Sequence, residues 1–439
     1  MSRDFDPATR VAVLGAGPMG LACALGLLDR GYAVDIYEAD DRIGGMSAHF
    51  DFDGLSIERY YHFICKPDQP MFDELERLGI ADTLRWSPTR MGYYYEGRLH
   101  EWGNPVALLR FPRISLLSRL RYGLHMFLSA KRRRWEDLDE VNAVAWIRRW
   151  IGPEAYAVLW ERLFRLKFHH FTDNLSAAWI WSRIRRVGNS RRSLMQEEMG
   201  YLEGGSETIL EAWRRAIEGQ GGRIHLKQPV TGIERDESGG FRLATPQGEA
   251  QADRVISTIP LPFVPRIAHC LPEAEKARYA DINNIGVVCL IYKLKKPVTE
   301  NFWLNVSDPD MAIPGIIEYS NLTGQEPHIV YVPYYLPREH EKFQEPDNAF
   351  IAEATGYLKR INPELTDEDI IAINVSRYGH AQPICEPGFA KKLPDIRTSV
   401  PGLYVADTSH YYPEDRSISE STRLGKRLAA MLAEDDRAC

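Results

Sequence analysis

The chain has 439 residues and a formal net charge of -7, with 44% hydrophobic and 26% charged residues. This composition is ordinary for a globular protein, and it excludes a disordered chain, a collagen-like repeat and a disulfide scaffold. The mild acidity gives no reason to expect nucleic acid as a partner. Six scattered cysteines form no Cys-x-x-Cys pair, so we expect no metal site and a reducing compartment.

The start of the chain and its apolar runs bear on location. The first ten residues are too acidic for a secretory signal. No apolar run approaches the roughly 20 residues that span a bilayer. We therefore expect a cytoplasmic protein, with peripheral contact to the inner face of a membrane kept as an alternative.

The first fifty residues predict a β-α-β unit. An apolar run at 11–14 is typical of a buried parallel strand. The glycine-rich turn GAGPMG at 15–20 follows, then a helix that stops at Gly31, then a strand that ends at Glu38. This order, with an acid 18 residues after Gly20, is the pattern of a dinucleotide-binding unit.

Each part of this unit has a physical task. Gly15 permits the tight turn, Gly17 lets the backbone approach a pyrophosphate, and Gly20 lets the helix pack on the strand. The helix N-terminus offers unpaired N–H groups, and Glu38 accepts hydrogen bonds from ribose hydroxyls. We therefore expect the dinucleotide to contact Gly15, Gly17, Pro18, Met19, Gly20 and Glu38.

The next segment indicates which dinucleotide binds. It reads Arg42-Ile-Gly44-Gly45-Met46. Together with the preceding motif it resembles the FAD-binding start of the amine oxidase superfamily, which includes protoporphyrinogen oxidases, phytoene desaturases and UDP-galactopyranose mutases. The resemblance implies a loop folded over the FAD diphosphate, with Arg42 on the phosphate oxygens and Gly44, Gly45 and Met46 beside it. No second GxGxxG occurs, so we expect no separate nicotinamide domain.

Later segments carry the same resemblance. It implies that the backbone of Val230 contacts the adenine and that Asp407, at the end of the run PGLYVAD, meets the FAD ribityl–phosphate region. It also implies that the final helix points its start, at Ile418 and Ser419, toward the flavin. Ser419 is interpreted either as a helix cap or as a flavin neighbour. The surroundings of Cys385 do not match a covalent attachment site, so we expect non-covalent FAD.

The implied fold is α/β, with a discontinuous Rossmann-like FAD-binding domain of the glutathione reductase type, a mixed β-sheet substrate domain and a helical insert. Alternating or apolar runs at 283–294, 314–322 and 328–336 are typical of strands of the substrate domain. The expected boundaries are 1–75, 199–272 and 395–439 for the FAD-binding domain, 76–110 and 273–394 for the substrate domain, and 111–198 for the insert.

The helical insert, residues 111–198, is basic and aromatic. Leu117, Leu120, Leu124 and Phe127 or Leu128 form a stripe at helical spacing, and residues 110–135 contain eight Lys or Arg and no acid. A second arginine cluster spans 183–192, and five tryptophans lie between 146 and 181 at spacings that suit core packing. The simplest interpretation is a stripe packed on its own domain. An anionic membrane surface and an anionic substrate, such as a nucleotide sugar, stay open.

The residues expected above the flavin come from three segments. Glu58-Arg-Tyr-Tyr61-His62 resembles a segment that places a histidine beside the flavin in the mutases. His62 is therefore the candidate catalytic residue, to orient or protonate a substrate, with a purely structural histidine as the alternative. We expect substrate contacts from Tyr61, Glu318, Tyr319, Tyr411 and Arg416, and loop packing is the alternative for the last two.

Two departures from the family weaken simple amine oxidation. Amine oxidases carry a lysine on the strand that we match to 283–294, where Val288 stands, and Ser417 stands at an aromatic-cage position. The leading hypothesis is an FAD-dependent oxidoreductase that moves a hydride from a C–N or C–C centre of a small molecule to flavin N5. The alternatives are a mutase-like enzyme that acts on a sugar nucleotide with reduced flavin, and a non-catalytic flavoprotein that binds a partner through the basic helices.

Overall fold

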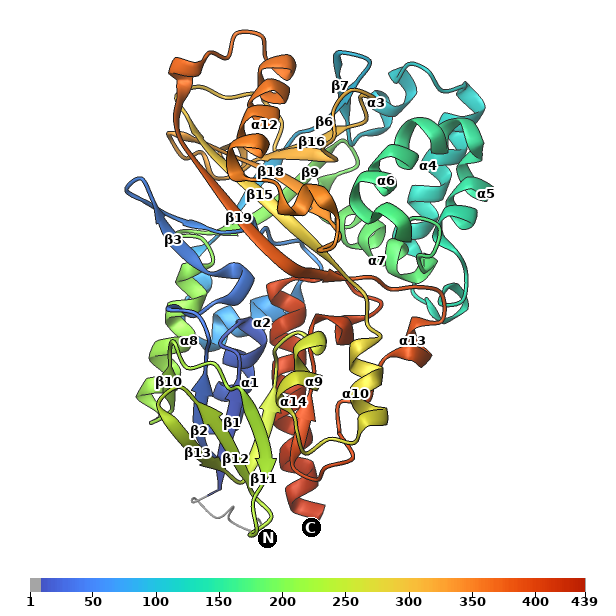
Figure 1. Ribbon diagram of the computed structural model, residues 1–439. Helices are drawn as coiled ribbons and strands as arrows, with labels where there is room; N and C mark the ends of the chain where they lie inside the picture. Colours follow the sequence, from blue (N-terminus) through green and yellow to red (C-terminus); the bar gives the residue numbers. More distant parts are fainter. Residues whose placement is uncertain (1–8, 439) are drawn as a thin grey trace.

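A five-stranded parallel sheet forms the lower half of the molecule in Figure 1. The computed structural model describes residues 9–438. All four strand pairs are parallel, and the strands come from three distant stretches of the sequence, as expected for a discontinuous nucleotide-binding fold. Their order is β10 (Arg223–His225), β2 (Ala33–Tyr37), β1 (Arg10–Leu14), β14 (Arg254–Ser257) and β20 (Leu403–Val405).

Helices from both ends of the chain cover this sheet. α1 (Pro18–Leu28) packs against α8 (Glu207–Gly219) and α14 (Ile418–Ala438), and α14 also contacts α2 (Gln69–Arg77). The contact between α1 and α14 is close, because a Cβ atom on Gly425 would lie 2.4 Å from the Met19 carbonyl oxygen. An antiparallel sheet of β11 (Gly232–Arg235), β12 (Phe241–Thr245) and β13 (Gly248–Ala252) completes this half.

A seven-stranded mixed sheet forms the upper half. Its order is β19 (Ile370–Pro383), β15 (Asn284–Leu294), β18 (His328–Leu336), β17 (Gly315–Glu318), β16 (Trp303–Val306), β6 (Met91–Tyr95) and β7 (Arg98–Trp102). The strands expected around 283–294, 314–322 and 328–336 are confirmed as β15, β17 and β18. The two faces of β15 enter different hydrophobic cores, and α12 (Asp347–Ile361) closes the outer one.

The helical insert lies to the right of the sheets in Figure 1. With α3 (Pro105–Arg110) just before it, it contains α4 (Leu116–Lys131), α5 (Ala143–Tyr156), α6 (Arg162–Phe168) and α7 (Ala177–Gly188). Ser115, Asn142 and Ser176 cap α4, α5 and α7 by accepting backbone N–H groups. Trp146, Trp179 and Trp181 are buried, which confirms the core role expected for most of the tryptophans.

The interpretation of the apolar stripe on α4 is wrong. Leu117, Leu120, Leu124, Phe127 and Leu128 all face solvent, with exposed fractions from 42% to 66%. The buried face of α4 carries polar residues instead. The spacing therefore predicted the helix correctly but assigned its faces the wrong way round.

The remaining elements are short. β3 (His49–Phe52) and β4 (Leu55–Glu58) form a hairpin, and β5 (Leu84–Thr89), β9 (Gln196–Leu202) and β8 (Arg191–Ser193) form a small sheet, so the end of the expected helical range is strand. The short helices are α9 (Val264–Ile267), α10 (Glu273–Ala280), α11 (Ser320–Thr323) and α13 (Phe389–Lys392). Within residues 9–438, none of the helices combines the length and apolar character needed to cross a membrane.

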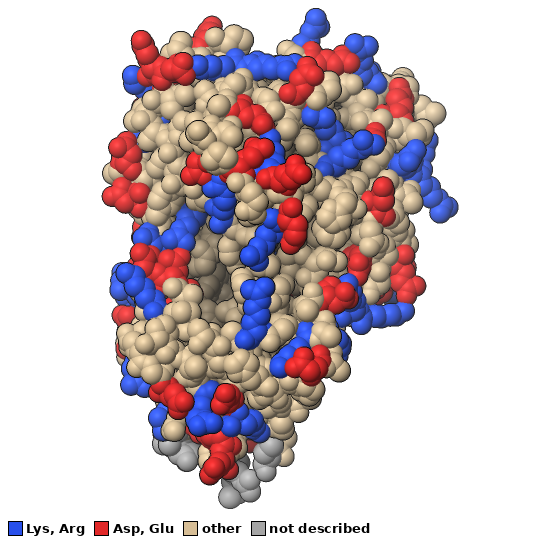
Figure 2. Space-filling view, viewed as in Figure 1, with Lys and Arg blue, Asp and Glu red and all other residues tan. Residues whose placement is uncertain are grey.

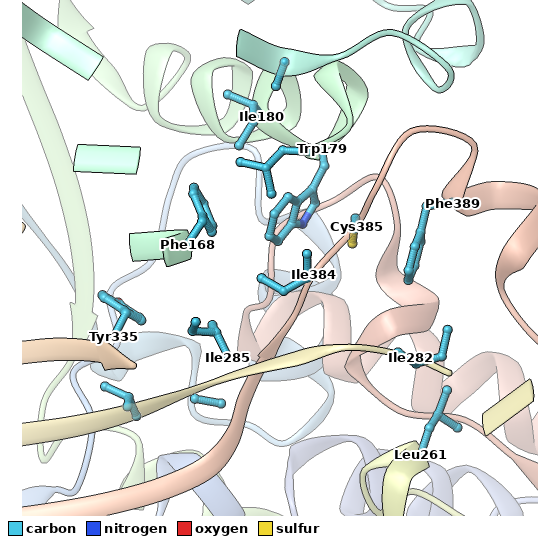
Figure 3. Close-up of a cluster of buried hydrophobic side chains, with 14 of the residues drawn as sticks. Phe168, Trp179, Ile180, Leu261, Ile282, Ile285, Tyr335, Ile384, Cys385 and Phe389 are labelled. Carbon is cyan, nitrogen blue, oxygen red and sulfur yellow. The ribbon is translucent and has the colours of Figure 1, made fainter. Parts of the chain in front are cut away.

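One hydrophobic core joins the insert to both sheets. In Figure 3, Phe168 and Trp179 from the insert face Ile384 and Ile285, which belong to the upper half. Cys385 and Phe389 extend this cluster toward α13. The insert is therefore fixed to the sheets by buried apolar contacts, and this fixes the position of any side chain that it sends into the site.

Candidate functional site

A cavity of about 1000 Å³ lies between the two halves of the molecule. Figure 2 shows the hollow on the left of the view, between the lower and upper parts. Its lining includes Leu14 and Tyr37, at the carboxyl ends of β1 and β2, and Val287, Cys289 and Tyr335 from the upper sheet. Ligands of open parallel sheets bind at this carboxyl edge.

The glycine turn gives this cavity a row of free donors. Gly15 has a φ of 97°, which suits glycine, and a Cβ on Gly20 would lie 2.0 Å from the Gly15 carbonyl oxygen. Gly17 and Pro18 line the cavity, and the first turn of α1 contains no acid. In the described part of the chain, the N–H groups of Gly17 and Met19 have no acceptor. The start of α1 therefore suits an anionic group such as a diphosphate.

Glu38 and Val230 lie beside the turn and line the cavity. The Glu38 carboxylate accepts hydrogen bonds from the N–H groups of Ala16 (2.7 Å) and Asp40 (2.9 Å). The Gln228 N–H donates to the Glu38 carbonyl oxygen, which holds the Val230 loop over the end of β2. The Val230 N–H has no acceptor among the described residues and is free for a ligand.

The loop after β2 does not bring Arg42 to the cavity, where we expected it to contact the diphosphate. Gly45 and Met46 line the cavity, but Arg42 does not. The Arg42 guanidinium donates to the His49 carbonyl oxygen and pairs with Asp41 at 2.8 Å. Arg59, which the sequence reasoning missed, lines the cavity as an ion pair with Asp40.

Two expected glycine contacts prove to be packing positions. Gly44 and Gly20 do not line the cavity. A Cβ on Gly44 would lie 2.6 Å from Leu210, at a φ of 113°, so this position serves the close approach of α8. Gly20 brings α1 close to the turn.

The start of α14 reaches the cavity through Ile418 and Ser419. The helix cap is Ser417, whose Oγ accepts the Glu420 N–H at 3.1 Å, so the interpretation of Ser419 as the cap is wrong. Ser419 Oγ is buried and has no hydrogen-bond partner among the residues that the structure describes. Asp407 also lines the cavity, and its carboxylate accepts the N–H groups of Leu261 and Ser409.

His62 lies on the cavity wall and is oriented by Glu58. The His62 Nδ1 lies 2.7 Å from the Glu58 carboxylate, and its Nε2 lies 3.3 Å from Ser47 Oγ. Burial alone would raise the pKa of Glu58, but His62 and His49 lower it to about 2. The Glu58 carboxylate therefore stays ionised and holds the His62 ring at Nδ1, in the way that a carboxylate orients a catalytic histidine.

The upper part of the cavity is an aromatic chamber, formed by Tyr61, Phe63, Trp303, Tyr319 and Tyr335. Tyr61 packs edge-on against Trp303 at 5.7 Å, and its hydroxyl lies 3.4 Å from that of Tyr335. Phe63 packs edge-on against Trp303 at 6.2 Å. Such a wall excludes water and suits an apolar or planar ligand.

Glu318 does not enter the chamber, so its expected substrate contact is wrong in position. It is fully buried, and its carboxylate accepts the N–H groups of Val298 (2.7 Å) and Thr299 (2.8 Å). Its neighbour Tyr319, which follows the end of β17, does line the chamber.

Two cations without acidic partners reach the chamber, Lys167 from α6 and Arg416 from the loop before α14. In the described residues neither has a carboxylate within 4.0 Å, whereas Arg183 pairs with Asp415 at 2.8 Å. The Lys167 ammonium lies 5.0 Å from the Tyr335 ring centre. Burial would raise the pKa of Tyr335, but Lys167 and Arg416 lower it below its ordinary value. Burial lowers the pKa of Lys167.

The sequence reasoning missed Lys167, because it compared only a position of β15, Val288, with the lysine of the family. Val288 faces away from the cavity, into the outer core, while Val287 and Cys289 face the cavity. A signal for Lys167 was present, because it lies three residues after Phe164 and one before Phe168, both buried. A lysine on the buried face of a helix is unusual and points to a site.

Tyr411 and Arg416 both line the cavity, in keeping with their expected positions. The Tyr411 hydroxyl bonds to Ser421 Oγ at 2.7 Å, which also gives it a structural role. Arg416 donates to the Ala381 carbonyl oxygen.

The lining fits a flavin dinucleotide. Within residues 9–438, three buried polar atoms of cavity-lining residues lack hydrogen-bond partners, namely Ser419 Oγ, Gln382 Nε2 and His380 Nδ1. Free N–H groups lie at the start of α1 and at Val230. Because buried polar groups are normally paired, these orphaned atoms indicate a polar ligand along the whole cavity. A diphosphate at α1 and a ring with polar edges near α14 would satisfy them.

Comparison with known sequences finds distant relatives. The chain is 26% identical over 294 residues to a 15-cis-phytoene desaturase of Synechococcus elongatus, an alignment covering 61% of this chain and 60% of that protein. It is 26% identical over 260 residues to a putative flavin-containing monoamine oxidase of Mycobacterium tuberculosis, covering 57% of this chain and 56% of that protein. The chain thus spans somewhat more than half the length of these relatives.

Solved structures share the fold across the whole chain. A putative protoporphyrinogen oxidase from Exiguobacterium aligns with a TM-score of 0.76 and 19% identity, covering 99% of this chain and 100% of that one. A putrescine oxidase aligns with a TM-score of 0.73 and 18% identity, covering 97% and 99%. The model of the family described as flavin containing amine oxidoreductase matches residues 20–418. With this match over most of its length, the chain belongs to the flavin-containing amine oxidoreductases.

Proposed function

We propose that the protein is an oxidoreductase with non-covalently bound FAD that oxidises a C–N or C–C centre of a small organic substrate. The observation that supports it most is that one continuous cavity joins the free donors of the glycine turn to the aromatic chamber. When bound, FAD supplies a two-electron acceptor that takes a hydride at N5. Gly15, Gly17, Pro18, Met19, Glu38, Gly45, Met46, Val230, Asp407, Ile418 and Ser419 would hold it.

Non-covalent binding is supported by the cysteines. Cys385 is buried in the hydrophobic core and does not line the cavity. Cys289 does line it, but burial raises the pKa of its thiol well above the ordinary value. A protonated, desolvated thiol is a poor nucleophile, so neither residue is suited to a thioether.

The chain's own groups can manage the proton that accompanies hydride loss. A substrate that loses a hydride from a C–H bond also loses one proton, from nitrogen or from the adjacent carbon. Lys167 and Tyr335 form a pair in which both pKa values are lowered, so either the amine nitrogen or the phenolate oxygen can accept that proton. His62, held by Glu58, would orient the substrate or donate a hydrogen bond to it from the wall.

The purified protein tests this proposal directly. We expect a yellow protein whose flavin band bleaches anaerobically with one class among amines, prenyl chains, porphyrinogens and nucleotide sugars. The Lys167→Met variant should keep FAD but lose turnover by about 100-fold or more, as expected for a lost general base. A colourless protein that takes up no added FAD would contradict the cofactor assignment, and full activity in Lys167→Met would contradict the proton role.

A mutase-like reaction on a sugar nucleotide is the second candidate. It is favoured by the two unpaired cations, Lys167 and Arg416, which would suit the diphosphate of an anionic substrate. Such an enzyme would show activity only after reduction with dithionite and no flavin reduction linked to turnover. The oxidoreductase would instead consume one electron acceptor for each substrate.

A further inference from the structure

Helix α4 exposes its apolar face to solvent and buries a polar face. Its outward face carries Leu116, Leu117, Leu120, Leu124, Phe127 and Leu128, with exposed fractions from 42% to 66%. Its inward face carries Ser118, His125 and Ser129, which are buried. At 100° per residue, the six apolar residues fall within about one third of the helix circumference. A helix in water would normally present the opposite arrangement.

The inward contacts fix this orientation. Ser118 Oγ donates to Glu154 at 2.9 Å, and the Ser129 carbonyl oxygen accepts from the Trp181 indole at 2.8 Å. His125 stacks on Trp150 with ring centres 5.4 Å apart. Rotating α4 to bury its leucines would break these buried contacts, so the apolar face is a permanent surface of the protein.

Neighbouring elements extend this surface. Val106 and Leu109 of α3 are 38% and 45% exposed. α3 lies against α4, because a Cβ on Gly123 would lie 3.6 Å from the Leu108 side chain. Arg191 donates to the carbonyl oxygens of Gly103 and Leu194, which brings the exposed turn of Leu194 and Met195 to the start of α3. The apolar patch comprises Val106, Leu109, the six residues of α4, Leu194 and Met195.

Basic residues lie close in the sequence to residues of the apolar patch. In the described part of the chain, no carboxylate lies within 4.0 Å of five basic residues near it, namely Arg110, Lys131, Arg133, Arg134 and Arg192. Residues 110–135 contain no acid, although the whole chain carries a charge of -7. Positive charge is therefore concentrated where the large apolar side chains are exposed.

We propose that the apolar patch docks on an anionic lipid surface, with α4 lying along the membrane plane. Leucine and phenylalanine side chains would enter the acyl boundary while the basic residues meet lipid phosphates. A second copy of the chain is a poorer occupant, because two-fold pairing of this patch would bring the basic residues of one copy close to those of the other. The proposal concerns a surface outside the cavity and does not depend on the reaction.

Co-sedimentation with vesicles tests the proposal. We expect the protein to bind vesicles of 70% phosphatidylcholine and 30% phosphatidylglycerol, to bind pure phosphatidylcholine at least about tenfold more weakly, and to dissociate at high salt. The double variant Leu120→Ser/Leu124→Ser should lower the partition coefficient by at least about tenfold. Arg133→Glu/Arg134→Glu should lower it on anionic vesicles alone.

Matched variants separate the patch from general effects. Leu226→Ser/Ile371→Ser removes two exposed apolar residues elsewhere, and Arg215→Glu/Arg427→Glu makes the same charge change on α8 and α14. Both should bind like the original chain, and all variants should keep its melting temperature. Absence of vesicle binding, equal loss in the control variants, or a dimer that Leu120→Ser/Leu124→Ser disperses would overturn the proposal.

Discussion

At the scale of single residues, the site contains a carboxylate that stays ionised, Glu58, and a pair of groups whose protonation can change, Lys167 and Tyr335. Glu58 is buried and ionised by its histidine neighbours, and it holds His62 in place. The Lys167 ammonium lies over the Tyr335 ring, 5.0 Å from its centre, and the protonation of each group affects that of the other. The first feature sets geometry, whereas the second is suited to moving a proton.

The Glu58 charge should be visible in the pH dependence of stability. Its pKa falls from 4.5 to about 2 on folding, so its stabilisation is complete above about pH 5 and is lost as the pH falls toward 2. Glu58→Gln should lower the free energy of unfolding at pH 7 by about 3 kcal/mol, and the difference should shrink in acid. Urea unfolding at pH 7 and pH 3 measures this. Glu273→Gln, an exposed change, should cost about 0.5 kcal/mol or less.

The Lys167–Tyr335 pair predicts a spectroscopic change. The lysine cation stabilises the phenolate, so Lys167→Met should raise the pKa of Tyr335. Ultraviolet titration of tyrosinate should show one tyrosine titrating at higher pH than in the original chain. Lys391→Met, at an exposed surface pair, serves as the control and should leave the titration unchanged. An unaltered curve in Lys167→Met would disprove the coupling.

At the scale of elements, the packing of α1 on α14 positions the start of α1. Gly425→Ala would place a Cβ 2.4 Å from the Met19 carbonyl oxygen, so the two helices must separate. We expect a loss of about 1–3 kcal/mol in stability and weaker FAD binding, because the donors of α1 shift. Thermal unfolding and flavin titration measure both. Gly356→Ala in α12 meets nothing within 4 Å and should be neutral or stabilising.

Elements with strong local signals were predictable from the sequence. The glycine turn, the strand around β15 and the final helix each follow from turn chemistry or periodicity. The sequence did not predict which face of α4 is buried, because a helical period gives the angle between residues but not which side packs against the protein. The same limit applies to Val288, which the sequence could not place in the outer core. Alternation along β15 gives two faces, and only the tertiary structure tells which face lines the cavity.

At the scale of the whole molecule, the chamber depends on three regions that no local pattern connects. Lys167 comes from the insert, Tyr335 from the upper sheet and Arg416 from the last loop. The glycine turn and the start of α1 follow a motif within one short segment, so the sequence predicted them, whereas Val230, Asp407 and Ser419 reach the same cavity from distant parts of the chain. The chamber arises from contacts between residues far apart in the chain, and the positions of Lys167 and Arg59 became clear only in the structure.

The last strand and last helix have a consequence for how the chain folds. β20 and α14 follow α1 in the chain by several hundred residues, yet they complete the lower sheet and cover α1. Contacts between such distant residues form slowly, because a long loop must close before they stabilise anything. During synthesis, the edge of β14 and the outer face of α1 therefore stay bare until β20 and α14 have been made, and this is the interval in which a chaperone would be most useful.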